Sequence, residues 1–338
     1  MVVLLPLSGA MTVTYELTHC AACGASNERE LATAASMKAE VESLWAFHTR
    51  RLRADIPSEH LMDRVAFSQH PALRVVRCRE CGTVYRNPIE RATELTAIYE
   101  DEGPPTEVLQ ALHETQRASY AAQAQRLTAQ FGRRGHGVEV GSYVGAFLAA
   151  ARDAGWRFTG VDVNAGANAF TRSLGFTVHD GDIASLDAGE RADVVAIWNC
   201  LDQLPDPVDA LRSARDHLAP GGMIALRVPN GACYAAWRPL LRGPLASIAR
   251  AWLAHNNLLG FPYRVGFTPS ALTRVVERLG FRVTHVHGDT LVPIADRWTR
   301  RWAALEERAV KRAIGAVSRL GGEDLPLAPW FELYARLG

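Results

Sequence analysis

The sequence predicts an α/β protein, in which helices cover both faces of a mostly parallel β-sheet. Three observations lead to this fold class. From residue 132 onward, short apolar segments alternate with segments of helical periodicity. The run Val194–Trp198 is almost continuously apolar, as in a strand that is buried on both faces. A glycine turn, Gly141 to Gly145, joins the end of a short strand to the start of a helix.

The composition is that of an ordinary globular protein without a broad electrostatic field. Of the 338 residues, 48% are hydrophobic and 22% are charged, which suffices for a sizeable core. The formal net charge is only +1. This balance argues against wide contact with nucleic-acid phosphates, so a nucleic-acid partner is not expected.

The sequence shows no membrane-spanning or secretory segment. No apolar run reaches the roughly 20 residues that span a bilayer, so we expect no membrane partner. Residues 1–10 are apolar but lack the basic start of a secretory signal, and Met11 is an alternative start site. Six cysteines in a chain of this length do not form a disulfide scaffold. We therefore expect a cytoplasmic protein.

The chain divides into three predicted regions. Residues 11–88 form an N-terminal domain with two CxxC units. Between these units, four apolar side chains at helical spacing indicate a helix, namely Val41, Leu44, Trp45 and Leu52. Residues 89–131 form a helical connector, with a short helix around 95–99 and a longer helix that ends near Phe131. Residues 132–338 form the α/β domain.

The order of elements in the α/β domain follows from apolar runs and turn residues. The expected strands are Gly137–Val140, Phe158–Asp162, Phe176–Val178, Val194–Trp198, Met223–Val228, Phe281–His287 and Trp330–Ala335. Helices are expected after Gly145, from Pro207, and from Pro269, where Thr268 supplies an N-cap. A basic amphipathic helix is expected at Arg297–Leu320.

The segment from Glu139 to Gly145 has the chemistry of a ligand-binding turn. Gly141 allows a tight backbone turn and close approach of a ligand, and Gly145 lets the helix begin near the sheet. The exposed N–H groups of such a turn can hold a carboxylate or the polar edge of a ligand. Because many ordinary strand-to-helix turns share this pattern, its position in the fold has to add weight.

The positions of two aspartates in the predicted fold strengthen the case for a ligand site. Asp162 ends the second strand, where a carboxylate can accept two hydrogen bonds from a ribose diol. Asp182 follows the third strand and could accept a hydrogen bond from an exocyclic adenine amine. Either aspartate alone is more typical of a solvated loop or a helix cap. Acidic residues at the carboxyl ends of three successive strands instead indicate a ligand site.

This ordered set resembles the class I S-adenosylmethionine (SAM)-dependent methyltransferases. The resemblance covers roughly residues 132–290 and rests on Glu139-x-Gly141-x-x-x-Gly145, Asp162, Gly181-Asp182, Asp193-Val194-Val195, Leu204-Pro205-Asp206-Pro207 and Pro220-Gly221-Gly222. It implies a Rossmann-like, seven-stranded sheet whose last strand is antiparallel. The helix at 297–320 would be inserted between the last two strands.

The resemblance also assigns cofactor-binding residues. Glu139 and the Gly141–Gly145 turn, with Ser142 and Tyr143, would hold the methionine part of SAM. Asp162, with its neighbour Val163, would hold the ribose. Asp182, with Ile183, would hold the adenine. The segment just beyond the fourth strand would line the methyl-donor end, with Asn199, Cys200 and Leu201. An NAD(P)-binding domain is the main alternative, but it expects G-x-G-x-x-G, and this turn has no middle glycine.

Four cysteines form two CxxCG units, Cys20 with Cys23 and Cys78 with Cys81. Two thiolates per unit give four in total, a closed shell typical of structural zinc. A redox role for one CxxC unit is the alternative interpretation. The run from Cys81 to Pro88 resembles the zinc-binding N-terminal segment of many bacterial sugar and natural-product methyltransferases.

The acceptor side is less clearly marked. Relatives carry a histidine in a Glu-His-Leu-Pro stretch, but the matching stretch here is Asp202-Gln203-Leu204-Pro205, and glutamine cannot act as a base. Asp202 could serve as the base, although a helix cap is the more usual role of such an aspartate. Residues 231–267 form an expected substrate lid, in which His255 and Tyr263 are further catalytic candidates. A lone histidine is more often structural.

The predicted function is SAM-dependent methylation of a small molecule. The resemblance favours a sugar, a nucleotide-sugar or a natural-product intermediate, modified at oxygen or carbon. The alternatives are an RNA methyltransferase, which the neutral charge disfavours, and a non-catalytic SAM-binding protein, which the missing histidine keeps open. A homo-oligomer is possible on the sequence.

Overall fold

The computed structural model describes residues 14–58, 71–91, 105–187, 191–294, 297–318, 320 and 322–338. The helix predicted around residues 95–99 and the N-terminal apolar segment lie outside these ranges. Within the described ranges, no helix combines the length and the apolar character that crossing a bilayer requires.

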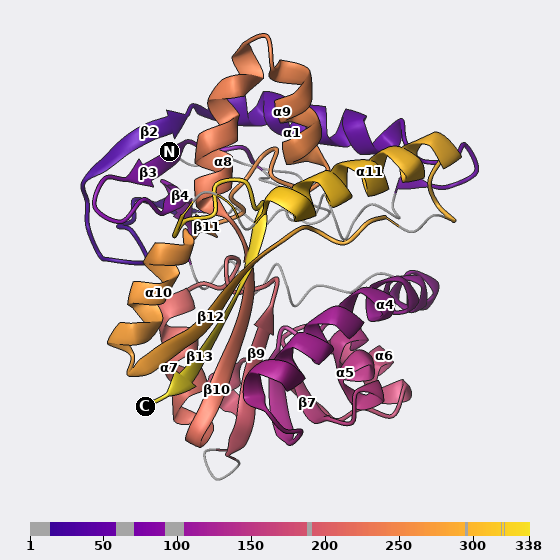
Figure 1. Cartoon of the computed structure of the whole chain (residues 1–338), viewed down its shortest axis with the longest axis vertical. Coiled ribbons are helices and arrows are strands. Elements are labelled where there is room, and N and C mark those ends of the chain that lie inside the picture. The colour runs from indigo at the N-terminus through magenta and orange to yellow at the C-terminus, as the bar shows by residue number, and fades with distance from the viewer. Residues whose placement is uncertain are drawn as a thin grey trace. The chain divides into compact units, whose positions relative to one another are not determined.

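A seven-stranded sheet forms the centre of the α/β part (Figure 1). Its strands are β6 (His136–Val140), β7 (Arg157–Asp162), β8 (Val178–Asp180), β9 (Ala192–Trp198), β10 (Leu218–Pro229), β12 (Phe281–Asp289) and β13 (Trp330–Leu337). They lie in the order β12-β13-β10-β9-β6-β7-β8. The five strands from β10 to β8 pair in parallel. The last strand, β13, is antiparallel, which confirms the predicted fold class.

Most predicted strands agree with the structure to within a few residues, but the third strand is displaced. It was expected at Phe176–Val178 and lies instead at Val178–Asp180. Gly175 has a left-handed backbone with φ of +82°, and the Phe176 ring lies under the Arg152 guanidinium at 4.2 Å. Phe176 thus contacts Arg152, near the end of the helix that follows Gly145, and pairing with β7 begins only at Val178.

Helices α4 (Thr106–Phe131) and α5 (Ala146–Asp153) pack together on one face of this sheet, whereas α7 (Pro207–Asp216) and α10 (Pro269–Arg278) lie on the other (Figure 1). Phe147 is fully buried in the core beneath α4 and makes edge contacts with Phe158 and Trp198 at centroid distances of 5.1 and 5.3 Å. Helix α6 (Ala165–Ser173), capped by Asn164, lies next to the turn between Gly141 and Gly145.

The N-terminal segment forms a small antiparallel sheet of its own. Its strands β2 (Glu28–Ala32), β3 (Val75–Cys78) and β4 (Val84–Arg86) continue into β11 (Val265–Gly266), which comes from the far end of the expected lid. A two-stranded pair, β1 (Tyr15–Glu16) with β5 (Ile89–Glu90), follows the same segment. The strand order shows that residues near 265 belong with the N-terminal segment.

Helix α1 (Ala34–Thr49) carries the predicted apolar stripe, with Val41 and Leu44 buried. Leu52 was expected on this helix, but it lies three residues beyond the helix and bridges Thr299. The expected lid contains α8 (Gly231–Trp237), the short helix η3 (Arg238–Arg242) and α9 (Ala246–Ala254).

The basic helix α11 (Arg301–Val317) is shorter at both ends than the predicted 297–320. Its place in the chain between β12 and β13 agrees with the expected insertion.

The chain consists of two compact units, and each is assembled from separate segments. The first unit contains Met1–Glu94, Val228–Leu272 and His287–Phe331, and the second contains Leu95–Arg227, Thr273–Val286 and Glu332–Gly338. The expected lid, 231–267, therefore belongs to the same unit as the cysteine-bearing segment. The three-domain division drawn from the sequence stays a prediction.

Candidate functional site

The turn after β6 is held in an unusual backbone conformation by three residues with positive φ. Gly141 and Gly145 have φ of +73° and +66°, and Tyr143 between them has +42°. A Cβ atom at Gly141 would lie 2.6 Å from the Cys200 sulfur, so only glycine fits there. The Gly141 N–H donates to the Val161 carbonyl at 2.8 Å, which joins the turn to the neighbouring strand.

Glu139 and Ser142 place unpartnered polar atoms beside this turn. The Glu139 side chain is 2% exposed, and its Oε2 has no hydrogen-bond partner among the described residues. The same is true of the buried Ser142 Oγ. Burial, and then the nearby Asp162 carboxylate, raise the pKa of Glu139 well above its usual range. Because buried polar groups are normally hydrogen-bonded, these atoms mark a place where a polar ligand fits.

Asp162 lies at the end of β7 and is anchored to the turn. One carboxylate oxygen accepts from the Tyr143 N–H at 2.8 Å, and the other accepts from the Asn164 N–H at 2.9 Å. Burial raises the pKa of Asp162, whereas these N–H donors lower it. A carboxylate has room for further donors, so Asp162 can still accept from a ligand. Val163 follows it directly at the same strand end.

Asp182 and Ile183 lie beyond β8. The Asp182 side chain is exposed and caps the short helix η2 (Ile183–Ser185), where its Oδ1 accepts from the Ser185 N–H at 3.1 Å. Ile183, the first residue of η2, is buried. The structure thus gives Asp182 the capping role that the sequence left open.

The segment beyond β9 lies against the glycine turn. Cys200 donates from its thiol to the Val140 carbonyl at 3.2 Å, and burial raises the pKa of this thiol well above its usual range. Leu201 is fully buried. Asn199 has a left-handed backbone, and its side chain contacts Tyr120 and Arg227, two residues that the sequence analysis missed. In the sequence, Tyr120 could have been noticed as a polar side chain on the inward side of the connector helix.

Asp202 carries a buried carboxyl group whose pKa is shifted toward neutral pH. Its side chain is 5% exposed, and its Oδ1 has no hydrogen-bond partner among the described residues. Burial raises the pKa of Asp202 to about 7. The expectation that Asp202 caps a helix was wrong, because Asp206 is the N-cap of α7 and accepts from the Val208 and Asp209 N–H groups, both at 2.9 Å.

His255 and Tyr263 belong to the first unit, and Asp202 belongs to the second. His255 is 1% exposed; its Nε2 accepts from the Arg51 guanidinium at 3.3 Å, and its ring meets Phe47 edge-on at 4.9 Å. Burial lowers the pKa of His255 to about 4, so the imidazole is neutral and weakly basic. These surroundings favour the structural interpretation of His255.

Tyr263 is half-buried, and its backbone carbonyl accepts from the Arg86 guanidinium at 2.8 Å. Its ring faces the same guanidinium at 5.9 Å. Arg86 in turn pairs with the buried Glu90 at 2.7 Å, and Arg264 also reaches Glu90 at 3.0 Å. The backbone around Tyr263 is thus tied to strands β4 and β5 of the N-terminal segment.

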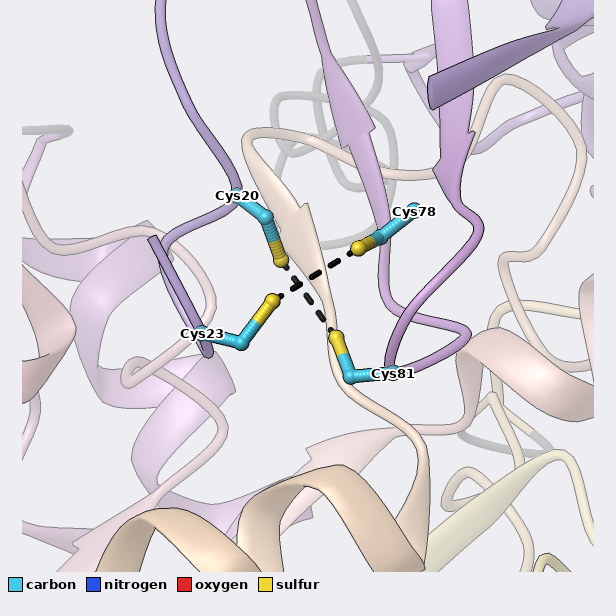
Figure 2. A group of neighbouring side chains, drawn as sticks. All are labelled: Cys20, Cys23, Cys78 and Cys81. Carbon is cyan, nitrogen blue, oxygen red and sulfur yellow. Dashed lines mark hydrogen bonds between the residues drawn. The ribbon is translucent and has the colours of Figure 1, made fainter. Parts of the chain in front are cut away.

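The four cysteines of the CxxCG units converge in the first unit (Figure 2). Their sulfur atoms all lie within 4.8 Å of one another, with Cys20 to Cys81 at 3.5 Å and Cys23 to Cys78 at 3.6 Å. A tetrahedral zinc ion with Zn–S bonds of about 2.3 Å separates its sulfur ligands by about 3.8 Å. The spacing of the four thiols therefore fits one tetrahedral ion.

The glycine in each CxxCG unit makes this convergence possible. Gly24 and Gly82 have φ of +74° and +81°, and each donates its N–H back to the first cysteine carbonyl of its unit, at 2.7 and 3.1 Å. The resulting turns present both thiols of a unit on the same side. The two units come from segments that β2 and β3 bring together by antiparallel pairing.

Comparison with known proteins places the α/β part in a family. A family model described as a methyltransferase domain matches residues 112–286, more than half of the chain. An uncharacterized methyltransferase of Mycobacterium leprae is 26% identical over 172 residues, which cover 49% of this chain and 56% of that protein. The chain thus spans about half the length of the curated relatives it matches.

Two solved methyltransferases are similar at low sequence identity. A SAM-dependent methyltransferase of Thermotoga maritima, described as a possible histamine N-methyltransferase, is 16% identical with a TM-score of 0.48, over 72% of this chain and all of that one. A glycopeptide N-methyltransferase in complex with SAM is also 16% identical, with a TM-score of 0.41, over 64% and 94% of the two chains. The observed strand order, rather than these likenesses, carries the fold assignment.

The tight fit around Gly145 can be tested by comparing its alanine substitution with that of Gly175, a glycine of similar conformation. An added Cβ at Gly145 would lie 2.6 Å from the Thr171 methyl, which cannot turn away because the Thr171 hydroxyl donates to the Tyr143 carbonyl at 2.8 Å. Gly175 has a similar φ of +82° and open space around it. We expect Gly175→Ala to cost about 1 kcal/mol and Gly145→Ala about 1–3 kcal/mol more in urea denaturation. Equal losses would contradict the tight fit at Gly145.

Asp202 should make stability depend on pH. Its pKa of about 7 in the folded chain exceeds the value near 4 of an unfolded aspartate, so the folded state binds more protons between these pH values. This contribution to stability is complete below about pH 4, is lost progressively as the pH rises from there, and is gone above about pH 7. We expect the melting temperature of Asp202→Asn to exceed that of the wild type only slightly at pH 4.5 and by more at pH 8.5. A constant difference across pH would contradict the raised pKa.

Proposed function

The chain belongs to the methyltransferase domain family, and on that basis we propose that it transfers the methyl group of SAM to a small molecule. One observation carries the proposal. Three buried polar atoms have no partners among the described residues: Glu139 Oε2 near the end of β6, Ser142 Oγ just after β6, and Asp202 Oδ1 after β9. In open α/β sheets, ligands bind at the carboxyl ends of the parallel strands.

The chemistry of these residues suits SAM. This cofactor carries a sulfonium and an ammonium group, and the site offers the carboxylates of Glu139, Asp162 and Asp202. Glu139 and the Gly141–Gly145 turn would hold the methionine part. Asp162, with Val163, would accept from the ribose diol, and Asp182, with Ile183, would hold the adenine. The segment from Asn199 to Leu201 would border the methyl-donor end.

Bound SAM would supply an electrophilic methyl group on its sulfonium. The chain has to exclude water, align the acceptor and take up the proton that a hydroxyl acceptor releases. Asp202 is suited to the last task, because Oδ1 has no partner in the described part of the chain and burial raises the pKa of this carboxyl to about 7. In this step the acceptor oxygen gains the methyl group, and its proton moves to Asp202 Oδ1. Gln203, at the position of the histidine of relatives, cannot take up that proton.

The acceptor we propose is a sugar, a nucleotide-sugar or a natural-product intermediate. The N-terminal cysteine segment and its resemblance to sugar and natural-product methyltransferases support this class. The net charge of +1 provides no broad positive electrostatic field that would attract an extended RNA. We also propose that the four cysteines bind one zinc ion with a structural role, since four thiolates leave no open coordination position for chemistry.

Calorimetry with SAM tests the cofactor proposal directly. We expect the wild-type protein to bind SAM and Asp162→Ala to bind it about tenfold to a hundredfold more weakly, because two hydrogen bonds from the diol to a charged group are lost. Asp153→Ala, which removes an exposed partner of Arg117, is the matched control and should bind normally. Absence of SAM binding by folded wild-type protein would contradict the proposed function.

The zinc proposal is tested by metal analysis of purified protein. We expect about one zinc per chain, and Cys78→Ser should lose the metal together with the folded state of the N-terminal sheet, because Cys78 ends β3. Cys233→Ser, a buried cysteine outside the cluster, is the control for loss of a thiol. Zinc retained at wild-type level in Cys78→Ser would rule out this site.

A further inference from the structure

The phenol of Tyr120 lies in a polar network at the carboxyl end of β9. Tyr120 comes from α4, the helix that precedes the sheet, and its hydroxyl accepts from the Asn199 side-chain amide at 2.9 Å. Its ring rests edge-on against Phe147 at a centroid distance of 5.8 Å. All of these residues belong to the second unit.

Hydrogen bonds hold both the backbone and the side chain of Asn199. Its backbone is left-handed with φ of +63°, an unfavourable conformation for a non-glycine residue. Its N–H donates to the Arg227 carbonyl at 2.9 Å, and its side-chain oxygen accepts from the Arg227 guanidinium. Its carbonyl accepts from the Gln203 side chain at 2.9 Å. With its oxygen occupied by Arg227, the amide nitrogen is left to face Tyr120, which sets the orientation of the phenol.

The Tyr120 hydroxyl keeps a hydrogen to donate. It already serves as the acceptor for Asn199, and no acceptor for its own proton is present among the described residues. Burial and the nearby Glu139 carboxylate raise the pKa of Tyr120, so the group stays protonated at neutral pH. A partly buried donor without an acceptor among the described residues indicates an acceptor on a ligand.

We propose that Tyr120 is a cofactor-binding residue whose hydroxyl, oriented by Asn199, donates a hydrogen bond to the carboxylate of the methionine part of SAM. The inference rests on the proposed function. It assigns the methionine end from contacts beside the glycine turn. The Tyr120 ring packs on Phe147, which follows Gly145 by two residues. Its hydroxyl bonds Asn199, whose neighbour Cys200 donates to the Val140 carbonyl just before the turn. The carboxylate is the one anionic group of SAM, and a phenol is a suitable donor to it.

The test compares two ligands that differ in the amino-acid end. S-adenosylhomocysteine carries the carboxylate, and 5′-methylthioadenosine lacks it. We expect Tyr120→Phe to weaken S-adenosylhomocysteine binding about tenfold or more and to leave methylthioadenosine binding unchanged, because one charge-assisted hydrogen bond is lost. Tyr334→Phe, which removes another phenol hydrogen bond of the second unit, to Glu332, is the matched control and should change neither affinity.

A second variant tests the orienting role of Asn199. Asn199→Gly keeps a left-handed turn accessible but removes the amide that holds the phenol. We expect it to weaken S-adenosylhomocysteine binding, and we expect Tyr120→Phe to add little in that background, a non-additive pair.

Three outcomes would overturn the assignment: equal weakening of both ligands in Tyr120→Phe, no weakening of either, or full additivity with Asn199→Gly. Failure of the wild-type protein to bind S-adenosylhomocysteine is a different result, since it would reject the proposed function itself. Melting temperatures of all variants show whether they are folded when binding is measured.

Discussion

Burial of carboxylates at the carboxyl end of the parallel sheet is the constraint on which the rest of the site depends. Removing a carboxylate from water is costly unless donors or a counter-charge replace the solvent. Asp162 meets this condition through two backbone N–H groups, and the left-handed turn is what aims the Tyr143 donor at it. Glu139 and Asp202 do not meet it within the described residues. The cationic cofactor proposed above would complete the set.

Hydrogen bonds to three neighbouring elements hold the turn between Gly141 and Gly145 in place. The neighbouring strand accepts from Gly141, the hydroxyl of Thr171 on α6 donates to the Tyr143 carbonyl, and His113 on α4 bonds the Val144 carbonyl at 2.7 Å. These contacts hold backbone conformations that would be unfavourable in an isolated peptide. A similar arrangement recurs at Asn199, where Arg227 and Tyr120 hold a second left-handed residue. Preorganised polar groups of this kind are the means by which a site avoids reorganisation when it binds.

Buried charged side chains join separate segments of the first unit. Glu40 on α1 accepts from the Tyr234 hydroxyl at 3.0 Å and from the Arg238 guanidinium at 2.9 Å, so that the N-terminal helix is tied to the insertion. Glu90 is shared by Arg86 and Arg264 in the same way. Breaking a buried pair leaves an uncompensated charge, so these contacts make the insertion and the N-terminal segment depend on each other. The insertion is therefore a structural part of this unit as well as a candidate lid.

The sequence by itself determined the fold class, the glycine turn with its acidic partners, and the four cysteines, because apolar periodicity, glycine spacing and CxxC spacing are local signals. The resemblance added the number of strands and the antiparallel last strand. Tertiary structure decided the rest. That His255 is buried against Arg51 and that Tyr120 reaches Asn199 depend on contacts between residues far apart in the chain. Burial and hydrogen-bond partners set the chemistry of a titratable group, and neither can be read from its neighbours in sequence.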